Sequence, residues 1–200
     1  MKTVVVTSAT GEPITLEEVK WQLRLEPGNV EEDEYLSSLI GMSRQRVESI
    51  TGRRLMPQTW KAYHDEWPAG DRLELPLPPL RSMASSGFMY KNSTGATTVF
   101  SSSSWDLDIY NEGYGEVVLK DGESWPSGNL YTANPISVSF NCGYASRAAI
   151  PAEIKHASHL MVSNFYENRE PYMVGVGYAI SKFPMSINTL LTNYRVGGFK

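Results

Sequence analysis

Residues 13–29 read PITLEEVKWQLRLEPGN, and this stretch decides how the fold begins. Thr15 and Glu18 have the Thr-x-x-Glu spacing of a capping box, in which the two residues satisfy each other's backbone N–H groups at a helix start. Apolar residues recur through the stretch at helical spacing, at Leu16, Val19 and Leu23. A Pro-Gly pair then interrupts the pattern. The sequence therefore predicts a short, capped helix that ends before residue 27.

A second, longer helix is predicted directly after this one. It begins in the acidic run at 31–34, because negative charge is favourable at the N-terminus of a helix. Gly52 stands near its end, where a left-handed residue commonly closes a helix. Its apolar residues form one stripe, at Leu36, Ile40, Val47 and Ile50. Residues 14–56 are therefore predicted to be a helical region.

Residues 57–144 have the composition of β-structure. Thr, Tyr, Trp, Val and Phe dominate short windows that Gly- and Asn-containing turns separate. The three prolines between Leu75 and Leu80 exclude a central strand, so we expect an extended segment along a sheet edge there. The predicted strands are 58–64, 72–75, 87–91, 97–100, 105–110, 115–119 and 135–141.

The chain returns to helix over residues 151–169. Pro151 suits the first turn of a helix. The apolar face is predicted to contain Ile154, Ala157, Ser158, Met161, Val162 and Phe165. Together with the helices of residues 14–56, this segment predicts an α+β fold: a small helical bundle with an inserted antiparallel β-region.

The last 30 residues form a separate prediction. Gly175-Val176-Gly177 precedes a short helix that Pro184 opens. A helix of about three turns is marginal alone, so its apolar side must pack on another surface. We therefore divide the chain into an α+β domain, 1–170, and an extended C-terminal docking tail, 171–200. We expect the tail to dock on a partner or a neighbouring subunit rather than on its own core.

Composition limits the classes of function. Apolar residues make up 41% of the chain and charged residues 20%, as in an ordinary folded domain. No run approaches the ~20 apolar residues of a membrane helix, and residues 1–13 lack the apolar run of a signal peptide. A net charge of −4 does not favour phosphate neutralisation on DNA. The single Cys142 is expected to be a buried residue at the end of a strand.

Two clusters have both a functional and a structural interpretation. Glu153, His156 and His159 are spaced three apart on one predicted helix, which could ligate a metal or could form a solvated or subunit-contacting face. Aromatic residues in the β-region could form a sugar-binding platform or could cover a small sheet, as at Trp60, Trp67, Trp105 and Trp125. We favour the structural interpretation for both clusters, so no metal is expected.

Catalytic motifs are not found. Gly113-x-Gly115 and Gly175-x-Gly177 lack the lysine and the helix context of a phosphate loop. Asp106 and Asp108 share one strand face, which is typical of solvated carboxylates more often than of a catalytic pair. We therefore expect no enzyme activity and no cofactor.

The order of motifs along the chain resembles that of head–tail connector (adaptor) proteins of long-tailed bacteriophages and gene transfer agents. The resemblance extends from about residue 12 to residue 196. It begins at Pro13–Lys20 and continues through Thr51-Gly52-Arg53 and Gln58-Thr59-Trp60. Further matches are 75–80, Trp125-Pro126, Gly143-Tyr144, Tyr166–Glu170, Phe183-Pro184, Leu190-Leu191 and Tyr194-Arg195.

The resemblance implies a structural role in the virion, at the head–tail interface, after assembly in the host cytoplasm. Such subunits form a ring, expected to be dodecameric, below the portal protein. The ring extends the DNA channel without sequence-specific binding and offers a surface to head-completion or tail-completion proteins, with no membrane involved. Candidate contacts with the portal or a neighbouring subunit are Leu160, Leu190, Leu191, Tyr194 and Arg195. The alternative function is a β-rich module that binds glycans or a host surface.

Overall fold

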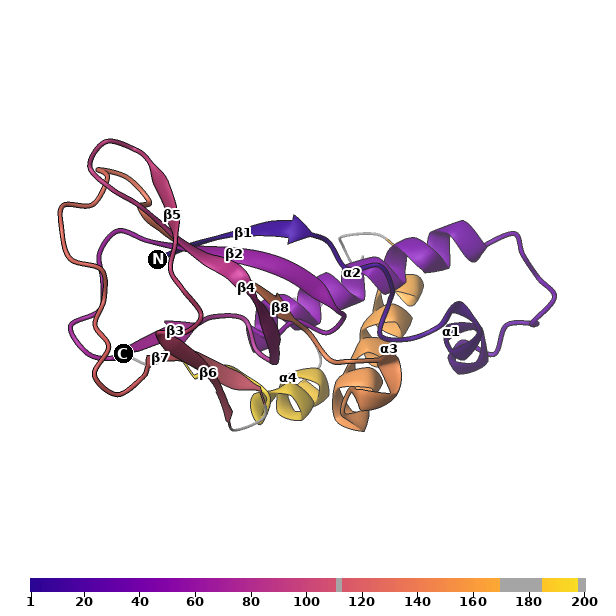
Figure 1. Cartoon of the computed structure of the whole chain (residues 1–200). Helices are drawn as coiled ribbons and strands as arrows, with labels where there is room; N and C mark the ends of the chain where they lie inside the picture. The colour runs from indigo at the N-terminus through magenta and orange to yellow at the C-terminus, as the bar shows by residue number, and fades with distance from the viewer. Residues whose placement is uncertain (111–112, 170–184, 198–200) are drawn as a thin grey trace, which may run out of the picture. The chain divides into compact units, whose positions relative to one another are not determined.

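The computed structural model describes residues 1–110, 113–169 and 185–197, which fold as two compact units (Figure 1). Of these, residues 1–10, 56–110 and 113–145 form the β unit, and residues 11–55, 146–169 and 185–197 form the helical unit. The predicted α+β class with an inserted antiparallel β-region is confirmed. The predicted Gly175–Gly177 link and the helix start at Pro184 lie outside the described residues.

The β unit contains a five-stranded antiparallel sheet in the order β1-β2-β8-β4-β5. A second antiparallel sheet has the order β3-β7-β6. The strands of the first sheet are β1 (Lys2–Thr7), β2 (Gln58–His64), β8 (Ile136–Cys142), β4 (Leu80–Lys91) and β5 (Thr97–Val99). Those of the second are β3 (Arg72–Leu75), β7 (Tyr114–Leu119) and β6 (Trp105–Tyr110).

All seven predicted strands are present, with differences of a few residues at most ends. The main extension is β4, which begins at Leu80, directly after the proline-rich segment. Strand β1 was not predicted, because Val4, Val5 and Val6 are consecutive and all exposed, so no alternation marks them as a strand. The strand forms because it pairs with β2 along one edge of the sheet.

Alternation in the central strands builds the core of the β unit. Ile136, Val138 and Phe140 point to one side of β8 and are buried, as is Cys142 at the end of that strand. Phe88 of β4 is also fully buried. The predicted role of Cys142 as a small buried residue is therefore confirmed.

Four α-helices form the helical unit. They are α1 (Leu16–Gln22), α2 (Asp33–Thr51), α3 (Ala152–Glu167) and α4 (Met185–Thr192). The predicted capping box begins α1: Thr15 Oγ1 accepts from the Glu18 N–H at 2.9 Å, and Glu18 Oε2 accepts from the Thr15 N–H at 2.6 Å. Gly52 closes α2 in the left-handed region, at φ 72°.

One cluster of the core of the helical unit lies between α1, α2 and α3. It contains Ile14, Val19, Leu36, Leu39, Ile40 and Val162, all buried. Phe165, predicted on the buried face of α3, packs against this core but is only partly buried. Of the helices in the described ranges, none combines the length and the apolarity needed to cross a membrane.

Candidate docking surface

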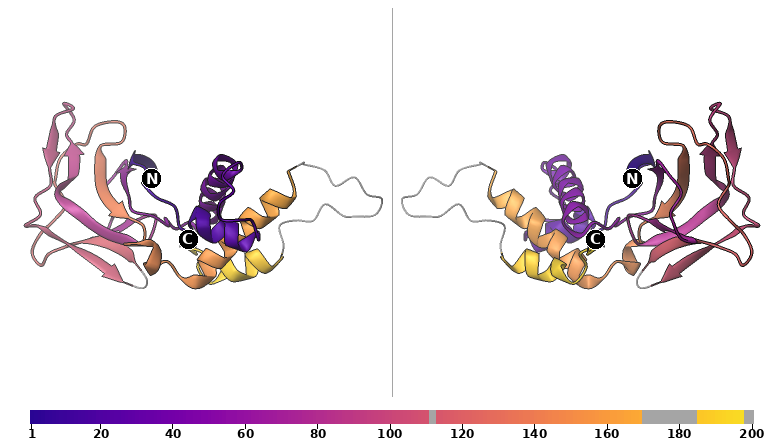
Figure 2. Two further views of the ribbon diagram at one scale, coloured as in Figure 1. Left: turned by 90° about the vertical axis from the view of Figure 1, so that its right-hand side faces the viewer. Right: turned by 90° about the vertical axis from the view of Figure 1, so that its left-hand side faces the viewer.

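The predicted docking tail packs on its own unit. Helix α4 contacts α3 and α2, and Figures 1 and 2 both show it alongside α3. Ile187 and Leu191 are fully buried. The prediction that the tail docks away from its own core is therefore wrong for residues 185–197. The physical reason is that packing α4 against α3 and α2 removes the apolar side chains of Ile187 and Leu191 from water.

Polar contacts fix the residues that follow α4. The Val196 N–H donates to the Thr51 carbonyl at 2.7 Å, and Arg53 Nε donates to the Tyr194 carbonyl at 2.8 Å. Gly52 leaves room for this contact, since a Cβ atom there would lie 3.2 Å from the Val196 Cβ. The Tyr194 hydroxyl also donates to the Glu153 carboxylate.

These contacts separate the five candidate contact residues into two groups. Leu191 is buried within the helical unit, so it is not available to a partner in this conformation. Leu160, Leu190 and Tyr194 are partly exposed, and Arg195 is exposed. Those four remain candidates, although the Arg195 guanidinium also donates to Asn188 Oδ1 at 3.3 Å.

A polar cluster connects the end of α3 to the start of α2. The Tyr166 hydroxyl donates to Glu32 Oε2 at 2.5 Å, and the Arg169 guanidinium donates to Glu32 Oε1 at 2.6 Å. The same guanidinium lies over the rings of Tyr35 and Tyr166, 4.6 and 4.9 Å from their centroids. These hydrogen bonds hold the pKa of Glu32 below its ordinary value. The cluster therefore connects α2 and α3 through hydrogen bonds to the Glu32 carboxylate.

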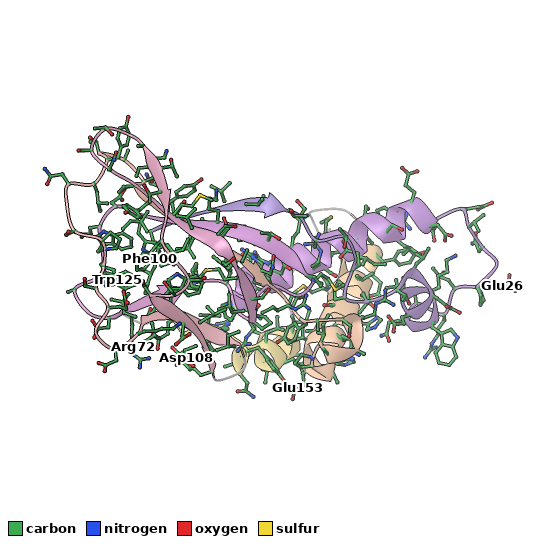
Figure 3. The ribbon with its side chains drawn as sticks, viewed as in Figure 1. Glu26, Arg72, Phe100, Asp108, Trp125 and Glu153 are labelled. Carbon is green, nitrogen blue, oxygen red and sulfur yellow. The ribbon has the colours of Figure 1, made fainter. Side chains whose placement is uncertain are left out.

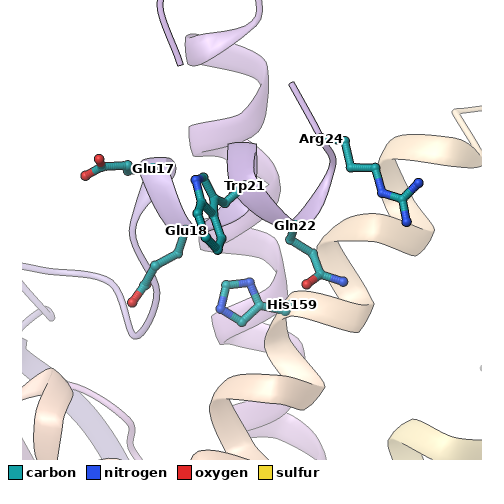
Figure 4. Close-up of a pocket in the computed structure, with 6 residues that line it drawn as sticks. All are labelled: Glu17, Glu18, Trp21, Gln22, Arg24 and His159. Atoms are coloured by element: carbon teal, nitrogen blue, oxygen red, sulfur yellow. The ribbon is translucent and has the colours of Figure 1, made fainter. Parts of the chain in front are cut away.

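One exposed apolar residue that the sequence prediction missed is Trp21, on α1. Figure 4 shows its indole standing beside Glu18 and Gln22, above His159 of α3. A hollow of about 640 Å³ is lined there by Trp21, Glu17, Glu18, Gln22, Arg24 and His159. The signal was in the sequence: Trp21 is two residues from Val19, so it lies on the side of α1 away from the apolar stripe.

His159 is the half-buried member of the predicted Glu-His-His cluster. Burial lowers its pKa, with Glu18 opposing this effect, so the imidazole is neutral near pH 7. Among the described residues, no group hydrogen-bonds its buried Nδ1 atom. His156 is exposed, and Glu153 accepts from Tyr194. Within the described ranges, no group of three or more His, Cys, Asp or Glu side chains is arranged to hold a metal ion.

Three tryptophans of the β unit, Trp67, Trp105 and Trp125, pack against other aromatic rings. The rings of Trp67 and Trp125 stack with their centroids 5.1 Å apart. The rings of Phe88 and Phe100 pack edge to face, with their centroids 5.2 Å apart. Figure 3 labels Phe100 and Trp125, whose ring centroids lie 5.8 Å apart. Trp105 is buried, whereas Trp60 is partly buried and donates to Gln58 Oε1 at 2.8 Å. This packing supports the interpretation that these aromatics cover the sheets.

Carboxylates cross the second sheet in one row. Glu116 of β7 lies between Glu74 of β3 and Asp108 of β6, and directly paired residues share a face. Arg72 pairs with the buried Glu116 and lies 3.9 Å from Asp108 (Figure 3). Lys120 lies 3.5 Å from Asp106. The cations thus offset part of the repulsion, and the row has a structural explanation.

Comparison with known proteins identifies the fold. Residues 13–74 match the family model of phage gp6-like head–tail connector proteins, which confirms the resemblance for that stretch. The whole chain, at 21% identity, superposes on 98% of a chain in the neck of an empty gene transfer agent (GTA) particle computed with C6 symmetry, with a TM-score of 0.78. No curated protein matches the chain.

Two further solved structures give the same result. A chain from the virion of a native GTA particle is 21% identical, with a TM-score of 0.77. A chain from the neck of a native GTA particle computed with C12 symmetry is 19% identical, with a TM-score of 0.71. Each comparison covers 100% of this chain and 98% of the other. The likeness therefore includes both the helical unit and the β unit.

Proposed function

We propose that this chain is a head–tail connector, a structural subunit of the neck of a phage or GTA particle. The observation that carries the proposal is the coverage of the likeness. A neck protein matches the entire chain, including the insertion of the β unit between α2 and α3. The family match over residues 13–74 adds sequence support at α1 and α2.

The subunit assembles as a closed ring below the portal protein. Neck structures of the same fold are described with C6 and C12 symmetry, which supports a cyclic assembly, with twelve copies as the proposed number. A ring needs two different faces on each subunit. The ring extends the DNA channel, and the chain's net charge of −4 supports passage of DNA without tight binding.

The proposed partners are the portal protein, a head-completion or tail-completion protein, and other copies of this chain. Leu160, Leu190, Tyr194 and Arg195 remain candidate contacts, because each is at least partly exposed. The site of action is the head–tail interface of the virion, after assembly in the host cytoplasm. The role is structural rather than catalytic, which the likeness to neck structures and to the head–tail connector family supports.

Sedimentation of the purified chain, alone and with purified portal protein, tests this proposal. We expect a folded monomer, or a ring, with the balance depending on concentration and on portal protein. A species larger than the portal should form in the mixture and carry many copies of the chain. A stable dimer under every condition, including with portal protein, would contradict the proposal, because a closed dimer leaves no face for a ring.

A further inference from the structure

Trp21 has the largest exposed fraction of any large apolar side chain among the described residues, 79%. Three hollows surround it. Besides the hollow toward His159, one of about 290 Å³ is lined by Trp21 with Leu16 and Pro27, and one of about 270 Å³ by Trp21 with Leu25 and Pro27. An indole between recesses is the geometry of an interface anchor, since buried tryptophans contribute strongly to protein interfaces.

The platform below Trp21 is ordered before any partner binds. The nearly buried Lys20 ammonium pairs with Asp33 Oδ1 at 2.5 Å and donates to the Asn29 carbonyl at 2.7 Å. These contacts connect α1, the loop after it and the start of α2. The capping box fixes the first turn of α1. Because little chain entropy is lost on binding, a preorganised surface of this kind binds with more of its interaction energy retained.

Charge decides what can cover this surface. Residues 16–34 contain seven carboxylates and two bases, a net charge of −5, whereas the whole chain has −4. All other residues together therefore have a net charge of +1. Glu17, Glu26, Glu31 and Glu34 are exposed, and no described residue forms an ion pair with them. This rim repels DNA phosphates and repels the same rim on a second copy, and the rest of the chain has almost no net opposite charge.

We propose that Trp21 and its acidic rim form the surface by which this chain docks on the portal protein. The partner offers an apolar recess for the indole, with Lys and Arg residues around it. The inference rests on the proposed function and replaces α4 as the docking element. The anchor is on α1, while the apolar residues Ile187 and Leu191 of α4 hold the helical unit together.

The test measures attachment of the purified chain to portal-bearing heads that lack it. Trp21→Ala should weaken attachment at least about thirtyfold, in the range of interface anchors. The matched control is Met42→Ala, a residue of α2 that is also exposed and lines none of the three hollows. A second variant, Glu17→Gln with Glu26→Gln, should slow attachment and reduce its sensitivity to salt, because it removes rim charge.

Three outcomes are distinguishable. Attachment of Trp21→Ala equal to wild type overturns the inference and leaves the proposed function intact. Loss of ring formation in Trp21→Ala, with attachment of each copy unchanged, shows that another copy of the chain covers Trp21 and also overturns it. If wild-type chain does not attach at all, the proposed function fails and the inference falls with it. A normal circular dichroism melting curve for each variant excludes unfolding as the cause.

Discussion

Helices α1 and α4 are both short, and both pack on the longer helices of the same unit, but they expose different residues. Helix α4 buries Ile187 and Leu191 completely. Helix α1 buries Val19 and leaves Trp21 almost fully exposed. A short amphipathic helix therefore uses its apolar stripe within its own fold, because that burial is what makes the helix stable. A residue that docks on a partner is therefore expected outside the apolar stripe of such a helix, as Trp21 is on α1.

The largest difference that we expect between the two helices is in how much each contributes to the free energy of unfolding. Leu191→Ala should lower the free energy of unfolding by about 2–5 kcal/mol, because it leaves a cavity where a leucine was fully buried. Trp21→Ala should change it by less than about 0.5 kcal/mol, although it removes a larger side chain, because an exposed side chain loses little packing. Urea denaturation of both variants measures the two values.

An unchanged stability of Leu191→Ala would contradict the packing of α4 on its own unit. Thr192→Ala, at an exposed position of the same helix, is the control: it removes a hydrogen bond from the Thr192 hydroxyl to the Asn188 carbonyl, 2.7 Å long, but no buried apolar surface. If Leu191→Ala is neutral but loses attachment to heads, the original prediction of a docking tail is restored. If Trp21→Ala unfolds the chain, the α1 anchor is instead part of the fold.

A smaller effect on stability is expected when the hydrogen bonds that connect α2 and α3 through Glu32 are removed. The hydrogen bonds from Tyr166 and Arg169 lower the pKa of Glu32, so the folded state favours the charged carboxylate. This contribution to stability is present above the unfolded pKa, near 4.5, and is lost as pH falls through the lower folded pKa. Glu32→Gln should therefore lower the melting temperature slightly at pH 7, and the difference from wild type should disappear in acid.

Melting curves of Glu32→Gln and wild type across pH 3–7 measure this difference. Glu31→Gln is the matched control, since its exposed side chain has no described partner. A difference between Glu32→Gln and wild type that stays constant down to pH 3 would show that the carboxylate charge is not what connects the two helices. Because the pKa of Glu32 is lowered in the folded state, the stability that its carboxylate contributes must be lost below pH 4.5.

The local elements were predictable because their signals are local. The capping box at Thr15 and Glu18 and the left-handed Gly52 act over one turn of helix, and both are present as predicted. Strand β1 was not predictable in this way. Its valines face solvent, and it is a strand only because residues 58–64, more than 50 positions away, pair with it.

The docking surface was predictable only in part, for the same reason. The sequence marks residues 185–196 as amphipathic, but it does not say which surface covers an apolar stripe. That surface is formed by α2 and α3, so the burial of Leu191 follows from tertiary packing and not from the local sequence. The exposure of Trp21 could have been predicted, because a tryptophan on the side of a helix opposite the apolar stripe does not pack into the core.

We propose that this chain forms a ring at the head–tail interface. Electron microscopy of portal-bearing heads incubated with the purified chain tests it most directly. We expect ring-shaped density, coaxial with the portal and present only when the chain is added, with both the helical unit and the β unit accounted for in each copy. Heads whose portal vertex is unchanged, or copies bound elsewhere on the capsid, would contradict the claim.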